Sequence, residues 1–290
     1  MQKRSEKKKV RPSQHQARQP GMEWKMKPRP QFFNPSALTG KKLKNKVALI
    51  TGGDSGIGRA VAVLFAEHGA SIAALYLNET ADAKETQLFI ESETGSSCML
   101  VRCDIQKENN CVNAVKRVVK KFGKIDVLVN NAGIHFPSED IQKLSHAQLE
   151  KTFRTNVFSM FYFVKAVLPY MKKGSTIINT ASVTAYRGSA HLIDYAATKG
   201  AIVSFTRSLS SALAEKGIRV NGVAPGPIWT PLIPSSFRAK DVSNFGSDVP
   251  LKRAGETSEV APCYLFLASD DSSYMTGQFL HPNGGEIING

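Results

Sequence analysis

A glycine-rich turn between an apolar strand and an apolar helix places the strongest constraint on how this chain folds. Residues 46–50 (Lys-Val-Ala-Leu-Ile) have the composition of a short buried strand, and residues 60–66 (Ala-Val-Ala-Val-Leu-Phe-Ala) have that of a helix. A glycine turn in this setting lets the backbone approach a pyrophosphate closely, and the helix N-terminus offers N–H groups to the phosphates. The sequence therefore predicts a dinucleotide-binding βα unit. The turn residues expected to contact the dinucleotide are Gly52, Asp54, Ser55, Gly56, Ile57 and Gly58.

Strand and helix patterns alternate along the rest of the chain. Repeated βα units predict a mainly parallel sheet with helices on both faces. With 290 residues, one α/β domain with an appendage fits better than two full domains. We therefore expect a single, doubly wound α/β domain. Further strands are expected at residues 70–77, 97–103, 126–129, 176–179, 219–223 and 277–281, with helices at 113–122, from 194 onward and at 259–268.

The N-terminal segment differs from the remainder in composition. Residues 1–46 hold 14 of the 38 Lys and Arg residues and only two acidic residues, so they account for +12 of the formal net charge of +14. Five prolines interrupt it and no helical or strand period is visible, so it cannot form a core by itself. We expect a basic, Pro-rich, mostly irregular extension over residues 1–43, partly disordered or packed on a main domain at 44–290. The apolar cluster of Phe32, Phe33 and Leu38 is expected to pin its later part to the body or to a neighbouring subunit.

Other features of the composition exclude several classes of protein. The four cysteines form no Cys-x-x-Cys pair and have no histidine-rich partner cluster, which predicts reduced thiols and neither a disulfide scaffold nor a metal site. No apolar run reaches the length of a membrane span, and the basic N-terminus is not followed by the apolar core of a secretory signal. We expect a cytoplasmic protein without membrane association. The extension shows no base-reading motif, so nucleic acid is not expected as a partner.

Residues 179–201 carry the pattern that points to chemistry. Tyr195 follows Ser182 after twelve intervening residues, and Lys199 comes four places later on a helical pattern. Residues four apart share one helix face, so the side chains of Tyr195 and Lys199 are expected side by side. An ammonium group beside a phenol favours the phenolate and lowers a pKa that is ordinarily about 10. Ser182 can hold a carbonyl or alcohol oxygen against that phenol, so the pattern predicts a proton-transfer site that needs a hydride carrier.

The end of the second expected strand bears on which dinucleotide binds. An acid at this position usually takes the ribose hydroxyls, whereas an arginine accommodates a 2′-phosphate. Here Tyr76 is followed by Leu77, Asn78 and Glu79, so the usual acid and the usual arginine are both missing. We expect NAD or NADP with a preference for NAD, because nothing obvious neutralises the additional phosphate. Arg59 or the extension can still reach this position.

The combined motifs resemble those of the short-chain dehydrogenase/reductase family. They comprise Thr-Gly-x-x-x-Gly-x-Gly at residues 51–58, Asn-Asn-Ala-Gly at residues 130–133, Asn156, and the Ser-Tyr-Lys pattern. The similarity covers residues 44–290. Within that family the chain resembles bacterial glucose/ribitol-dehydrogenase-type oxidoreductases that carry a basic N-terminal extension. The resemblance implies a Rossmann catalytic domain and a homotetramer.

The resemblance also implies roles for individual residues. Tyr195 is implied as the general acid in reduction and the general base in oxidation. Lys199 is implied to lower the pKa of Tyr195 and to bind the nicotinamide ribose, and Ser182 to orient the substrate oxygen. Asn156 is implied at a helix irregularity, where it supports a water-linked proton path through Lys199. The remaining residues expected to contact the cofactor are Tyr76, Asp104, Ile105, Asn131, Ala132, Gly133, Pro225, Gly226, Ile228 and Thr230.

These patterns predict an NAD(P)-dependent oxidoreductase that acts on CH-OH donors. It would move a hydride between the cofactor and a small carbonyl or secondary alcohol of the sugar, polyol or aldehyde class. Two alternatives remain open: a non-catalytic dinucleotide-binding redox sensor, and a binder of anionic surfaces that acts through the extension. The polar segment 231–247 is expected to be a mobile substrate lid. His191 and Tyr186 are expected to shape the substrate pocket, and Arg187 either binds an acidic substrate or faces water.

Overall fold

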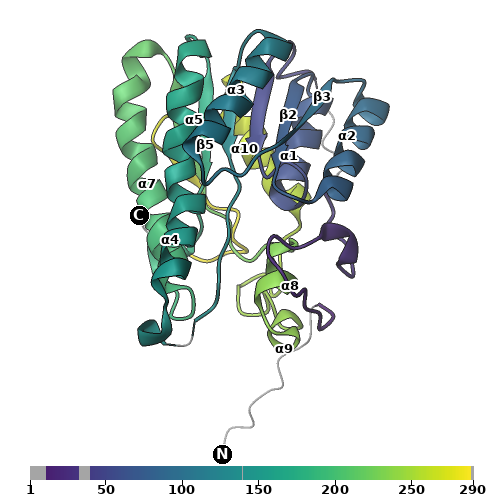
Figure 1. The fold of residues 1–290 in the computed structure, drawn as a ribbon, viewed down its shortest axis with the longest axis vertical. Helices are drawn as coiled ribbons and strands as arrows, with labels where there is room; N and C mark the ends of the chain where they lie inside the picture. The colour runs from purple at the N-terminus through teal and green to yellow at the C-terminus, as the bar shows by residue number, and fades with distance from the viewer. Residues whose placement is uncertain (1–10, 33–39, 139, 289–290) are drawn as a thin grey trace, which may run out of the picture.

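A seven-stranded parallel sheet runs through the protein, with helices on both of its faces (Figure 1). The computed structural model describes residues 11–32, 40–138 and 140–288. The strand order is β3-β2-β1-β4-β5-β6-β7. The predicted single, doubly wound α/β domain is therefore confirmed. The strands are β1 (Val47–Thr51), β2 (Ser71–Tyr76), β3 (Cys98–Arg102), β4 (Val127–Asn130), β5 (Thr176–Thr180), β6 (Arg219–Val223) and β7 (Phe279–Leu280).

The helices bury two separate apolar layers against the sheet. Helices α1, α2 and α10 pack on one face, where the core includes Phe65, Ile90 and Tyr264. Helices α3, α5 and α7 cover the other face, where the core includes Phe163 and Leu213. The helices are α1 (Gly56–Glu67), α2 (Thr80–Thr94), α3 (Glu108–Phe122), α4 (His146–Phe153), α5 (Ser159–Val167), α6 (Thr184–Arg187), α7 (Ile193–Leu213), α8 (Leu232–Ser236), α9 (Ala239–Val242) and α10 (Thr257–Ala268).

The order of the strands places the functional cleft. The chain builds outward from β1 to β2 and β3, then returns to pair β4 with the other edge of β1. Ligands of open parallel sheets bind at the carboxyl ends of the strands, where the strand order reverses. The reversal lies between β1 and β4, directly beside the glycine turn that follows β1.

Most element boundaries agree with the sequence patterns to within a few residues. Helix α3 begins at Glu108 rather than near residue 113, and the last strand is the two-residue β7 rather than the five residues expected. Helices α2, α4 and α5, within residues 80–94 and 146–167, were not expected from the sequence patterns. None of the helices within the described ranges is long and apolar enough to span a bilayer. The four cysteines are free thiols, three of them buried.

The described part of the extension lies along the outside of the main domain, beside α2 and α8 (Figure 1). The ring of Phe32 packs edge-on against Phe89 of α2, with 5.3 Å between centroids. The indole N–H of Trp229 donates a hydrogen bond of 2.6 Å to the carbonyl oxygen of Pro28. These contacts attach the described part of the extension to the body; Phe33 and Leu38 lie outside the described residues.

Four basic side chains in the described part of the extension pair with acidic residues of the body. Because each ion pair neutralises a positive charge, this part of the extension presents less free charge than its sequence suggests. Arg29 and Glu85 illustrate the exposed type, with a bidentate pair at 2.9 and 3.1 Å. The pairs are Arg11–Glu256, Arg18–Glu79, Arg29–Glu85 and Lys42–Asp271.

One ion pair between the extension and the body is fully buried. Nη1 of Arg59, in α1, lies 2.5 Å from Oε1 of Glu23, and neither side chain is exposed. The other carboxylate oxygen of Glu23 accepts a hydrogen bond of 2.6 Å from the backbone N–H of Gly56, at the start of α1. Burial raises the pKa of Glu23 to about 7, and the charge of Arg59 opposes that rise. The extension is therefore fastened directly to the glycine turn.

We expect Glu23→Ala to lower the free energy of unfolding by about 3 kcal/mol, because it removes the nearest counter-charge of the buried Arg59. Arg29→Ala is the matched control, since it removes an exposed ion pair and is expected to cost less than about 1 kcal/mol. Urea unfolding of the two variants measures the difference. Equal losses in the two variants would contradict the assignment of Glu23 as the anchor of the extension.

Candidate active site

A large cleft, with a volume of about 1160 Å³, opens at the carboxyl ends of the central strands. Nearly all the residues expected from the sequence to contact substrate or cofactor line this one cleft; Gly58 and Asn156 lie behind its wall. The predicted residues that line it are Gly52, Asp54, Ser55, Gly56, Ile57, Tyr76, Asp104, Ile105, Asn131, Ala132, Gly133, Ser182, Tyr195, Lys199, Pro225, Gly226, Ile228 and Thr230.

The glycine turn between β1 and α1 has a backbone that side chains would disrupt. Gly52 and Gly56 have φ angles of +62° and +55°, in the left-handed region that favours glycine. A side chain on Gly58 would collide with the carbonyl oxygen of Gly52. Gly58 therefore allows the turn to pack against the helix, while the other glycines leave the cleft side open to backbone approach. This shape fits a pyrophosphate at the N-terminus of α1.

The loop after β4 is tied to the end of β1. The hydroxyl of Thr51 accepts hydrogen bonds from the backbone N–H groups of Asn131 (2.9 Å) and Ala132 (3.0 Å). A Cβ atom on Gly133 would lie 3.6 Å from Nζ of Lys199. The Asn-Asn-Ala-Gly segment thus brings bare backbone close to the lysine.

Asn156 lies in one turn of π-helix, Arg154–Phe158, that interrupts the helical run from α4 to α5. Its amide exchanges two hydrogen bonds of 2.9 Å with the backbone of Ile134 and donates a third, of 3.1 Å, to the hydroxyl of Thr198. The helix irregularity implied by the family resemblance is present. Through these contacts Asn156 holds the loop after β4 against α7, which carries Tyr195 and Lys199.

Ser182, Tyr195 and Lys199 meet at one side of the cleft. Tyr195 lies in the first turn of α7, and Nζ of Lys199 lies 5.3 Å from the centroid of its ring. The ammonium group of Lys199 donates a hydrogen bond of 2.7 Å to the carbonyl oxygen of Thr180, the last residue of β5. Ser182 follows β5 by two residues. Strand β5 and helix α7 therefore set the spacing of the three side chains.

The pKa values of Tyr195 and Lys199 differ from the expectation that Lys199 lowers the pKa of Tyr195. Burial raises the pKa of Tyr195 to about 12, and a hydrogen bond with the side chain of Ser182 acts in the opposite direction. Burial also lowers the pKa of Lys199 to about 7. A low-dielectric site disfavours the charged form of both groups. Desolvation therefore outweighs the attraction between ammonium and phenolate that the sequence argument relied on.

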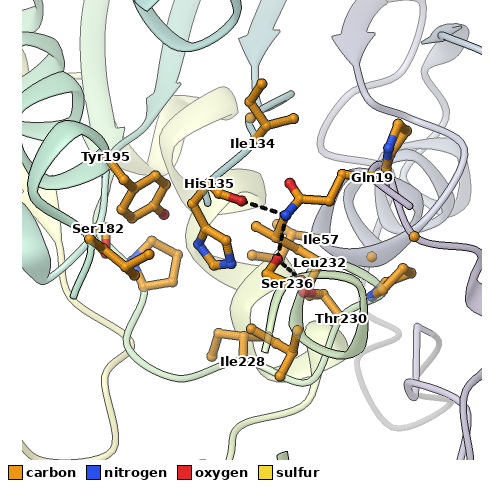
Figure 2. Close-up of a pocket in the computed structure, with 18 of the residues that line it drawn as sticks. Gln19, Ile57, Ile134, His135, Ser182, Tyr195, Ile228, Thr230, Leu232 and Ser236 are labelled. Atoms are coloured by element: carbon orange, nitrogen blue, oxygen red, sulfur yellow. Dashed lines mark hydrogen bonds between the residues drawn. The ribbon is translucent and has the colours of Figure 1, made fainter. Parts of the chain in front are cut away.

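His135 is a cleft residue that the sequence analysis did not single out. Its ring packs edge-on against the rings of Tyr195 and Phe237, with centroids 5.1 and 5.2 Å apart. Figure 2 shows it between Tyr195 and Ser236. Its position two residues after the Asn-Asn-Ala-Gly segment is the only sequence signal for it, and that signal does not say which way the side chain points.

The extension also forms part of the cleft, which its composition did not predict. Gln19, Pro20 and Gly21 line the cleft. Figure 2 shows the side-chain amide of Gln19 donating to the carbonyl oxygen of His135 and to the hydroxyl of Ser236, the latter at 2.8 Å. The extension therefore bridges the loop after β4 and helix α8.

Near the end of β2, a residue that lines the cleft binds a side chain of the extension. Glu79 lines the cleft, and its carboxylate accepts hydrogen bonds from the guanidinium of Arg18 (2.7 Å) and the backbone N–H of Asn78 (3.0 Å). The side chain of Glu79 is 1% exposed, whereas that of Arg18 is 44% exposed. A basic group therefore does stand near the end of β2, supplied from a distant part of the sequence.

The segment expected to shape the substrate pocket is divided between two places. His191 lines the cleft and is exposed, and Arg187 also lines it but pairs with Glu286 at 3.2 Å. Tyr186 is wrongly assigned to the pocket: it faces a separate small cavity beside Arg207 and His281. The expected lid, residues 231–247, folds into α8 and α9 and forms one wall of the cleft.

Comparison with known proteins identifies the family. A family model described as enoyl-(acyl carrier protein) reductase matches residues 52–286. A short chain dehydrogenase from Burkholderia cenocepacia, crystallised in complex with NADP, superposes with a TM-score of 0.79 at 29% identity and covers 84% of this chain and 98% of its own. The chain belongs to the short-chain dehydrogenase/reductase family. A blue fluorescent protein from a metagenomic library, in complex with NADPH, superposes with a TM-score of 0.78 at 32% identity, covering 84% of this chain and 98% of that one.

Two relatives within the short-chain dehydrogenase/reductase family have names that state an activity. NADPH-dependent aldehyde reductase 1, chloroplastic, of Arabidopsis thaliana is 54% identical and covers 95% of this chain and 98% of its own length. The glucose and ribitol dehydrogenase of Daucus carota is 51% identical, over 96% of this chain and 98% of its own. These matches confirm the resemblance drawn from the motifs. They support an oxidoreductase with a nicotinamide cofactor.

Proposed function

We propose that this chain transfers a hydride between NADP(H) or NAD(H) and a small carbonyl or secondary alcohol of the sugar, polyol or aldehyde class. The observation that carries the proposal is the convergence of Ser182, Tyr195 and Lys199 on the cleft that contains the glycine turn. An aldehyde reductase and a glucose and ribitol dehydrogenase among the relatives support this substrate class.

Tyr195, Ser182 and Lys199 have separate roles in the proton transfer. The bound nicotinamide supplies or accepts the hydride. In reduction, the hydroxyl of Tyr195 gives its proton to the substrate oxygen, which the hydroxyl of Ser182 holds by a hydrogen bond. Lys199, whose pKa burial lowers to about 7, exchanges a proton readily near neutral pH and so relays protons to the tyrosine. In oxidation the same groups act in reverse.

We expect Tyr195→Phe to lower kcat by about 10²–10⁴-fold, because it removes the group that exchanges the proton with the substrate oxygen. Turnover of a small aldehyde with NADPH, followed by nicotinamide absorbance, measures the loss. A fluorescence titration of the same variant with NADPH is the control and should give a dissociation constant close to that of the unaltered protein. Substantial remaining turnover would overturn the acid–base role of Tyr195.

The pKa of Tyr195 sets the expected pH dependence in each direction. Reduction needs the protonated phenol, which the raised pKa of about 12 preserves, so its rate should not fall through loss of this proton as the pH rises toward 10. Oxidation needs the phenolate, whose fraction grows about tenfold per pH unit below the pKa, so its rate should rise with pH. Ser182→Ala removes a hydrogen bond that lowers this pKa, and the rising limb of oxidation should move to higher pH. If the rise of the oxidation rate stays at the same pH, the hydrogen bond between Ser182 and Tyr195 is contradicted.

The choice of cofactor depends on Arg18. The preference for NAD rested on the lack of a basic residue near the end of β2, and Arg18 of the extension stands there. Its Nη1 is engaged by Glu79, while Nη2 and Nε have no hydrogen-bond partner within the described residues. Those donors are available to a 2′-phosphate on the adenosine ribose. We therefore propose that the chain uses NADP(H), with Arg18 as the residue that recognises the phosphate.

Arg18→Ala tests this assignment by binding alone. We expect NADPH to bind about tenfold more weakly, since a charge-assisted hydrogen bond is lost, and NADH to change by less than about threefold. Nicotinamide fluorescence titration with both cofactors measures the two dissociation constants. Arg29→Ala is the matched control, because Arg29 also pairs the extension with an acid of the body, but its partner Glu85 does not line the cleft, whereas Glu79, the partner of Arg18, does. Equal weakening of both cofactors, or none of NADPH, would overturn the role of Arg18.

A further inference from the structure

The imidazole of His135 is a buried polar group without a hydrogen-bond partner. The residue is 4% exposed, and neither Nδ1 nor Nε2 has a partner among the described residues. Buried polar atoms are nearly always hydrogen-bonded, because a lost hydrogen bond to water is otherwise uncompensated. An imidazole in this state in a ligand cleft therefore points to a ligand group that satisfies it.

The charge state of the ring decides what that ligand group is. Burial and the nearby Lys199 lower the pKa of His135 to about 3, so the ring is neutral at ordinary pH. A neutral imidazole presents one N–H donor and one acceptor nitrogen. A hydroxyl group, which donates and accepts, matches either nitrogen. A carboxylate or phosphate would be matched by only one of them.

The position of the ring decides which part of the ligand it meets. Its centroid lies 5.1 Å from that of Tyr195, so the two rings share one region of the cleft. Figure 2 shows the ring facing the space bounded by Tyr195, Ser182 and Ile228. A substrate whose reacting oxygen reaches Tyr195 and Ser182 would bring its neighbouring carbon atoms to His135.

The surroundings hold the ring in one orientation. Tyr195 and Phe237 pack on it edge-on from two sides, and the side chain of Gln19 binds its backbone carbonyl oxygen. Residues from the loop after β4, from α7, from the segment after α8 and from the extension thus converge on one imidazole. A side chain held in this way pays little entropy when it binds a ligand.

We propose that His135 is a specificity-determining residue that hydrogen-bonds a second hydroxyl of the substrate, next to the carbon that reacts. This inference rests on the proposed function and deepens it. It selects hydroxylated aldehydes, ketones and polyols over unsubstituted carbonyl compounds of the same length. It also assigns to His135 a part of the specificity that the sequence placed on the exposed His191.

The test compares glyceraldehyde with propanal, which has the same carbon chain without the two hydroxyls. His135→Phe keeps a ring of similar size for Tyr195 and Phe237 to pack on and removes both nitrogens. We expect kcat/KM for glyceraldehyde to fall about 10- to 100-fold in this variant, with propanal changed by less than about threefold. A ratio between the two aldehydes equal to that of the unaltered protein would overturn the proposal.

His281→Phe is the matched control. His281 lines the separate small cavity and packs against Tyr186, with 4.8 Å between ring centroids. This variant should leave the ratio of the two aldehydes unchanged. The melting temperature distinguishes a binding role from a structural role. His135→Phe removes two unsatisfied buried atoms, so its melting temperature should stay equal or rise. If the imidazole only stabilised the fold, the melting temperature should fall. A fall in melting temperature with an unchanged ratio would assign His135 to packing alone.

Calorimetric titration with ribitol separates this proposal from the proposed function. If neither aldehyde is reduced by the unaltered protein, the proposed function fails, and the titration still decides the role of His135. Ribitol binding to the NADP-saturated protein that is lost in His135→Phe supports the assignment. Equal binding in the two proteins, or no binding to either, overturns it.

Discussion

The buried guanidinium of Arg59 makes the contacts on which the arrangement of the cleft depends. It binds the carboxylate of Glu23, the carbonyl oxygen of Asp54 in the glycine turn and the carbonyl oxygen of Asp82 in α2. A buried charge is tolerated only when its hydrogen bonds are satisfied, so these segments must come together when the chain folds. The extension, the glycine turn and helix α2 are thereby held in fixed positions relative to one another. Of these segments, the glycine turn and the extension line the cleft.

This anchoring gives the basic extension a position in the cleft. From Glu23 the chain leads back through Gly21, Pro20 and Gln19, which line the cleft, to Arg18 at the end of β2. A Cβ atom on Gly21 would collide with the backbone of Pro231, so this passage beside α8 has room for glycine alone. An extension that served only to bind an anionic surface would not need to pack this closely beside α8. Within the described residues, Arg11, Arg18, Arg29 and Lys42 of the extension are paired with acids of the same chain.

The sequence predicted the sheet, the turn and the lining of the cleft because those features are encoded locally. A strand followed by a glycine turn and a helix has one stable packing, and Tyr195 and Lys199 need only a helix to come together. Arg18 and His135 could not be predicted in the same way. Arg18 reaches Glu79 across 61 positions of sequence through an irregular segment. The direction of the His135 ring depends on aromatic neighbours from α7 and from the segment after α8.

The protonation states of the buried side chains could not be predicted from residue spacing for a different physical reason. The spacing places Lys199 near Tyr195 and predicts that the lysine lowers the pKa of the tyrosine. This effect requires that the lysine is charged. Burial shifts Lys199, Tyr195 and His135 toward their neutral forms, which spacing cannot reveal. Neutral and partly unsatisfied polar groups are matched best by a ligand that brings hydroxyl groups. The low dielectric around Tyr195, Lys199 and His135 is therefore the physical basis of the hydroxyl preference that we propose for His135.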